Sequence, residues 1–131
     1  MGKLEKVISK RTDVDNSGPV DEKEIKKSEA ELGLRFSKEY SEYLESYGQI
    51  SIEGHEFTGL KCAKYLNVVQ ATKEEWGLDA EISREWYVVE QAGIDGIVIW
   101  QDSKGNLHQS SPSTKAFKLA DSFADYIASR E

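Results

Sequence analysis

Apolar positions between residues 25 and 36 follow one stripe of a helix, and a glycine lies within this stretch. Ile25, Leu32 and Phe36 recur at helical spacing, while charged residues fill most positions between them. Gly33 follows Leu32 at the place where a left-handed residue commonly ends a helix. The pattern therefore predicts an amphipathic helix that buries its apolar stripe and ends at Gly33.

A second helix is predicted directly after the first. Ser37 can accept a hydrogen bond from the amide of Tyr40, so we expect it to cap a helix that begins at Lys38. Gly48 is expected to end this helix. Two short amphipathic helices with so few residues between them form an antiparallel or angled pair. The side chains expected to be largely buried in this pair are those of Leu32, Phe36, Tyr40 and Leu44.

Weaker patterns lie on either side of the helix pair. Residues 4–8 predict a short helix near the N-terminus, and the polar residues 13–21 predict a loop. After the pair, alternating apolar residues predict a strand and a turn within residues 50–57. Thr72 can cap a following helix, which Gly77 is expected to end.

The C-terminal half is rich in β-branched and aromatic residues, which favour strands. Strands are expected at residues 86–90, 97–100, 107–109 and 117–119, with a loop at 110–113. A final helix is predicted after a cap at Asp121 or Ser122. Helices at both ends of a run of antiparallel strands predict an α+β fold. We expect residues 1–131 to form a single domain in which helices flank an antiparallel sheet.

The charge balance indicates what kind of partner the chain can bind. The sequence has 24 acidic and 17 basic residues and a formal net charge of −7. A protein that binds nucleic acid needs a positive surface, so direct binding to nucleic acid is not expected. The charge suits a basic protein partner. It is equally compatible with a role in keeping a small protein soluble.

Other features of the composition suggest a location in the cytoplasm. The single cysteine, Cys62, excludes an intramolecular disulfide framework and fits a reducing compartment. The first residues lack the apolar stretch of a signal peptide, and no apolar run is long enough for a membrane span. The sequence therefore predicts a soluble cytoplasmic protein without a membrane partner.

The order and spacing of these motifs resemble the SUKH superfamily of immunity proteins and cell-wall-regulator-like proteins. The resemblance extends from Val20 nearly to the end of the chain. It departs from the family at two turn positions, where Ser37 replaces a common proline and Gln49 replaces a frequent glycine. The residues that carry the resemblance most directly are Ile25, Glu29, Leu32, Gly33, Tyr40, Tyr43, Leu44, Gly48, Gly54, Gly59 and Leu60.

The resemblance implies a bacterial α+β protein that neutralises a cognate toxin, usually a nuclease, by binding it and without catalysis. The chemistry-bearing residues agree with this expectation. The histidines, His55 and His108, lie in separate segments that are expected to be turns, and neither has a nearby third ligand for zinc. Cys62 has no adjacent base and is expected to be a small buried residue. No enzymatic activity, cofactor or metal centre is therefore predicted.

The strongest competing motif is a calcium-loop pattern at residues 13–24. Asp13, Asp15, Ser17 and Glu24 occupy ligand positions of a twelve-residue loop, and Gly18 occupies the turn position. Pro19 directly after the glycine and the short preceding helix count against calcium binding. The alternative function is accordingly a calcium-responsive or regulatory scaffold for protein interactions.

For the immunity function, the partner-binding surface is expected where acidic residues lie beside tryptophan. All three tryptophans are more commonly core residues at this chain length, but an exposed one would be a candidate anchor. The surface is predicted to contact a basic toxin domain, in keeping with the net charge. The residues assigned to it are Glu74, Glu75, Trp76, Asp95, Trp100 and Asp102.

Overall fold

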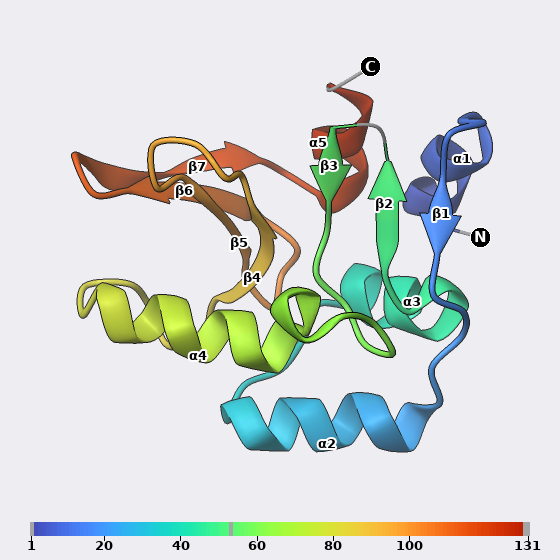
Figure 1. Ribbon diagram of the computed structural model, residues 1–131, viewed down its shortest axis with the longest axis horizontal. Coiled ribbons are helices and arrows are strands. Elements are labelled where there is room, and N and C mark those ends of the chain that lie inside the picture. The colour runs from blue at the N-terminus through green and yellow to red at the C-terminus, as the bar shows by residue number, and fades with distance from the viewer. Residues whose placement is uncertain (1, 53, 130–131) are drawn as a thin grey trace.

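The computed structural model describes residues 2–52 and 54–129 of the chain (Figure 1). The helices are α1 (Lys3–Ser9), α2 (Glu22–Leu32), α3 (Lys38–Tyr47), the 3-10 helix η1 (Lys64–Leu66), α4 (Val68–Leu78) and α5 (Phe123–Ala128). The strands are β1 (Asp15–Asn16), β2 (Ile50–Ile52), β3 (His55–Glu56), β4 (Tyr87–Gln91), β5 (Val98–Gln101), β6 (Leu107–Ser111) and β7 (Thr114–Ala120). This arrangement confirms the predicted α+β class.

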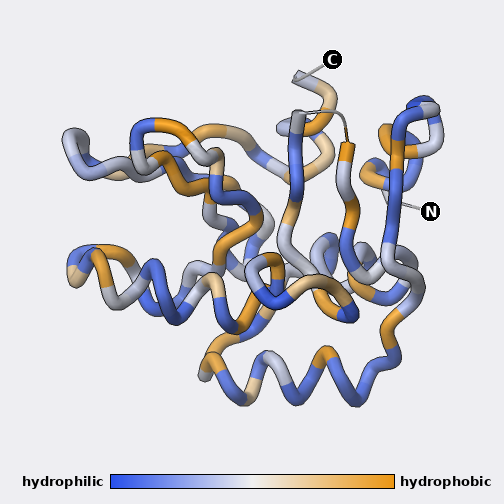
Figure 2. The backbone as a smooth tube through the Cα atoms, in the orientation of Figure 1, coloured by the Kyte–Doolittle hydropathy of each residue, from blue (hydrophilic) through white to orange (hydrophobic). Residues whose placement is uncertain are grey.

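The helix pair α2–α3 forms as the sequence predicts. Gly33 follows α2 in the left-handed conformation, with φ of 70°, and Ser37 accepts a hydrogen bond of 3.0 Å from the amide of Tyr40. Figure 2 shows hydrophilic and hydrophobic segments alternating along α2, as expected for an amphipathic helix. Leu32, Phe36, Tyr40 and Leu44 are all buried, so the predicted apolar stripe faces the core.

The described strands form two antiparallel sheets, where the sequence predicted one. The first has the order β1-β2-β3 and the second has the order β4-β5-β6-β7. Among the described residues, they are joined by a bridge between Phe57 and Glu90 and by a 2.9 Å hydrogen bond from Thr58 N to Val89 O. Because the chain after β3 pairs with β4 at so few positions, the sheets remain separate.

The second sheet has a buried layer on each face. Val88, Val98 and Trp100 form one buried cluster with Ala71 of α4, which lies along this face in Figure 1. Neighbouring strand residues such as Tyr87, Val89, Ile99 and Leu107 belong to the larger cluster, which includes residues of α3 and α5. This division follows from the alternation of side chains between the faces of a strand.

The helix α4 differs from its predicted form. It begins four residues before Thr72, because the side chain of Asn67 accepts hydrogen bonds from the amides of Val69 and Gln70. Thr72 is therefore an interior residue rather than a cap, and its buried hydroxyl accepts a 3.0 Å hydrogen bond from Val88 N. The helix also continues through Gly77 to Leu78.

Two smaller predictions also need correction. Ser110 and Ser111 belong to β6 rather than to a loop, since Ser110 pairs with Val98 of β5. His55 lies in β3 rather than in a turn, whereas His108 lies in β6, where a strand was expected at residues 107–109.

Among residues 2–52 and 54–129, no helix is both long and apolar enough to cross a bilayer.

Candidate partner-binding site

An open cleft of about 380 Å³ lies at the end of the layer between α4 and the second sheet. Its walls come from the C-terminal part of α4, from the loop 92–97 between β4 and β5, and from the turn after β6. We refer to it as the α4 cleft. Its lining includes Glu75, Leu78, Asp79, Ile94, Asp95 and Trp100.

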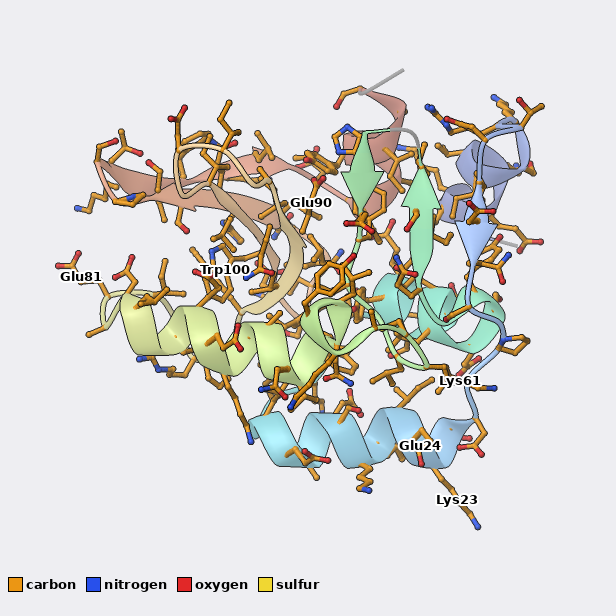
Figure 3. All side chains as sticks on the ribbon, viewed as in Figure 1. Lys23, Glu24, Lys61, Glu81, Glu90 and Trp100 are labelled. Carbon is orange, nitrogen blue, oxygen red and sulfur yellow. The ribbon has the colours of Figure 1, made fainter. Side chains whose placement is uncertain are left out.

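The α4 cleft has apolar walls that are open to solvent. Leu78 is 80% exposed and Ile94 is 62% exposed, and both line the cleft. Trp100 forms part of its floor but is only 1% exposed, and its indole Nε1 donates a 2.9 Å hydrogen bond to Ser110 Oγ. Figure 3 shows Trp100 between the sheet and α4. Large exposed apolar side chains that share one concave surface indicate an interaction site, whereas isolated ones do not.

Among the described residues, every charged side chain that lines the α4 cleft is acidic. Glu75 accepts a 2.7 Å hydrogen bond from the side-chain amide of Gln91, which ties α4 to β4. Asp79 follows the end of α4 and accepts a 3.0 Å hydrogen bond from the amide of Glu81. Asp95 is exposed at the tip of the loop 92–97. A surface with this composition attracts cationic partners.

The loop 92–97 is held in place by tight backbone contacts. Ala92 N donates to Ile97 O, and Ile97 N donates to Ile94 O, at 3.1 and 3.0 Å. Gly96 packs so closely against Pro112 that an added Cβ would lie 2.9 Å from the proline ring. This contact fixes the loop against the turn between β6 and β7, so the cleft has two well-supported walls.

The structure brings together only part of the predicted contact set. Glu75 and Asp95 line the same cleft although they are far apart in the sequence. Glu74 is exposed on α4 but does not line the cleft. Trp100 is core, as expected for most tryptophans, so its burial removes it as an exposed anchor.

The other predicted aromatic contact, Trp76, is only partly buried. Its Nε1 donates a 3.2 Å hydrogen bond to the carbonyl of Trp86, and the guanidinium of Arg84 lies 5.4 Å from its ring centroid. These contacts hold the indole against the protein and occupy its polar edge. Trp76 therefore supports α4 beside the cleft and does not form a cleft wall.

Asp102 lies in a different place and has a structural role. Its carboxylate accepts hydrogen bonds from the amides of Lys104 and Asn106 and makes a 3.0 Å contact with His108 Nε2. The His108 ring in turn stacks on Trp86 at 4.0 Å. Burial acts to raise the pKa of Asp102, but its hydrogen bonds outweigh burial and hold that pKa below the usual value.

The four residues of the calcium-loop motif make other contacts in the structure. Asp13 pairs with the guanidinium of Arg11 through two 3.0 Å hydrogen bonds, and Asp15 lies in β1 opposite Ser51. Ser17 donates its hydroxyl proton to Leu60 O, and Glu24 belongs to the first turn of α2. Within the described parts of the chain, no group of three or more His, Cys, Asp or Glu residues could hold a metal ion.

Sequence reasoning missed the two apolar walls of the cleft and Asp79 beside them. A signal was present, since Leu78 follows the glycine that was expected to end its helix and Ile94 lies between Gly93 and Asp95 in an expected turn. Apolar side chains in such polar, exposed segments are not expected to be buried in the core. Their position therefore favours a surface function.

Comparison with protein families identifies a relationship over nearly the whole chain. The model of the family described as "SUKH_5: SMI1-KNR4 cell-wall" matches residues 3–130. A comparison with curated proteins finds no significant match.

Proposed function

Because the chain belongs to the SMI1-KNR4 (SUKH_5) family, we propose that it is a bacterial immunity protein that binds and neutralises a cognate toxin domain. The proposed action is binding without catalysis, in the cytoplasm, where a nuclease toxin would reach its substrate. The observation that carries the proposal is the α4 cleft, whose apolar walls and acidic charges have the composition of a surface for a basic protein.

The proposed mechanism follows from the electrostatics of a nuclease. A nuclease must be positive where it grips phosphate groups. An acidic protein can occupy that groove and exclude the nucleic acid without any chemistry of its own. The acidic residues Glu74, Glu75 and Asp95 would act mainly on the association rate, whereas the apolar contacts of Leu78 and Ile94 would slow dissociation.

The test is a binding and protection assay with candidate toxin domains encoded by genes that neighbour this one. Glu75→Lys and Asp95→Lys should each lower the association rate by about tenfold at low salt, and less at high salt, because screening weakens long-range attraction. Both variants should also reduce survival of cells that express the toxin. Glu31→Lys is the matched control, since Glu31 is an exposed acid on α2 outside the cleft.

The results separate the function from the surface. If the wild-type protein neither binds the toxin domain at micromolar concentration nor protects cells, the proposed function is wrong. If it binds and protects but all three variants behave alike, the immunity function holds and the assignment of the α4 cleft is wrong.

A further inference from the structure

We propose that the α4 cleft receives one arginine or lysine side chain of the partner protein. Its methylene groups would lie between Leu78 and Ile94, and its cationic end would lie near Glu75 and Asp95. The inference rests on the proposed function, because it specifies which part of a basic partner enters the surface described above.

The first argument is the combination of walls and charges. A long cationic side chain is apolar along its stem and charged only at its end. The cleft offers the same two features, since Leu78 and Ile94 are exposed apolar walls and the charged groups around them are carboxylates. An apolar ligand would leave the carboxylates without a partner, and a small inorganic cation would leave the apolar walls uncovered.

The second argument concerns the hydrogen-bonding capacity of the carboxylates. Glu75 uses Oε2 to accept from Gln91, and this bond holds the carboxylate in place with its other oxygen available. Among the described residues, the structure records no hydrogen bond or ion pair that involves the Asp95 carboxylate. A guanidinium group has several donors and bridges carboxylates well, so arginine suits this site better than lysine does.

The third argument is size. The cleft, at about 380 Å³, has room for a single extended side chain.

The experiment is a nuclear magnetic resonance titration of the full ¹⁵N-labelled chain with two blocked peptides. One is acetyl-Gly-Gly-Arg-Gly-Gly-amide, and the other has neutral citrulline in place of arginine. The arginine peptide should cause saturable shifts of the amide signals of residues 75–79 and 93–97. The citrulline peptide, which keeps the shape and loses the charge, should bind at least about tenfold more weakly.

Variants then test the individual contacts. Glu75→Gln and Asp95→Asn should each weaken binding of the arginine peptide by about threefold or more, and Leu78→Ala should weaken both peptides. Glu81→Gln is the control, because Glu81 is an exposed acid just beyond the end of α4 (Figure 3). Glu81 does not line the cleft. The affinity of this variant for the arginine peptide should equal that of the wild-type protein.

Three outcomes overturn the inference: equal binding of the two peptides, shifts that lie outside the cleft, or equal effects of Glu81→Gln and Glu75→Gln. These outcomes are distinct from failure of the proposed function. If the toxin domain binds and protects while the arginine peptide does not bind the cleft, only the inference fails. If the arginine peptide binds the cleft and the toxin domain does not, the inference is supported and the proposed toxin is wrong.

Discussion

The hydroxyl group of Tyr43 connects α3 to two segments of extended chain. Its side chain is buried, donates a 2.5 Å hydrogen bond to Thr58 O, and accepts one of 3.0 Å from Ile50 N. Burial raises the pKa of Tyr43, so the group stays protonated and can keep both bonds. The hydroxyl therefore satisfies two backbone groups that have no access to water.

We expect Tyr43→Phe to lower the free energy of unfolding by about 1–3 kcal/mol, because it leaves a buried donor and a buried acceptor unsatisfied. Urea denaturation measures this change. Tyr47→Phe is the matched control, since Tyr47 lies one turn later in α3 and is only half-buried. Equal destabilisation by the two variants would contradict the role assigned to the Tyr43 hydroxyl.

Asp102 should make stability depend on pH. Its pKa is held below the usual value in the folded protein, so its ionised form stabilises the fold above the unfolded pKa, which is about 3.9. This contribution is lost as the pH falls through the lower folded pKa. Asp102→Asn should therefore cost about 1 kcal/mol at pH 7 and markedly less near pH 2. Urea titrations at both pH values test this expectation, and a cost that does not change with pH would contradict it.

At the scale of elements, the apolar stripe of the helix pair supplies much of the core. Leu32 at the end of α2 is 6% exposed, whereas Leu78 at the end of α4 is almost fully exposed. Leu32→Ala should lower the free energy of unfolding by about 2–5 kcal/mol, because it leaves a cavity. Leu78→Ala should change it by less than about 0.5 kcal/mol. If thermal or urea unfolding shows similar losses for both variants, Leu78 is a structural residue and not a free cleft wall.

Helices were predictable where local signals agreed with one another. For α3, the cap Ser37, the apolar spacing and Gly48 all indicated the same boundaries, and these boundaries are confirmed. For α4, two residues with capping side chains compete, and the β-branched Val68 and Val69 obscured the earlier start at Asn67. The hydroxyl of Thr72 accepts a hydrogen bond from Val88 N of β4 instead of capping the helix, and this contact between distant residues is not visible in the local sequence.

At the scale of the whole molecule, the two sheets are expected to unfold together. The tryptophans all lie beside the second sheet, where Trp100, Trp76 and Trp86 contribute to one cluster. The larger cluster, however, joins strands of both sheets to α3 and α5. Because this core is shared, separation of the sheets would expose it, and a chain of this size commonly unfolds in one step.

The measurement compares two signals during urea denaturation. Tryptophan fluorescence reports the second sheet, and far-ultraviolet circular dichroism reports all helices and strands. The two midpoints should coincide. A fluorescence transition at clearly lower urea concentration would show that α4 and the second sheet unfold first, and would contradict the expectation of a single cooperative unit.

The sequence predicted the class of the fold better than the location of the site. Acidic residues and their suitability for a basic partner were visible from charge alone. The placement of Glu75 and Asp95 in one cleft was not visible, because it depends on how α4 packs on the second sheet and on the contact of Gly96 with Pro112. Likewise, the separation into two sheets depends on long-range pairing, which local patterns do not contain.

The division of the α4 cleft into a buried floor and exposed walls has an evolutionary consequence. Trp100 and Val98 belong to the core, so most replacements there would damage folding. Leu78 and Ile94 are largely exposed, so replacing either side chain removes little buried surface. The main constraint at Asp95 is its positive φ of 53°, a conformation that glycine and asparagine also tolerate. New specificities can therefore arise at the walls one substitution at a time, while the inherited scaffold beneath them stays unchanged.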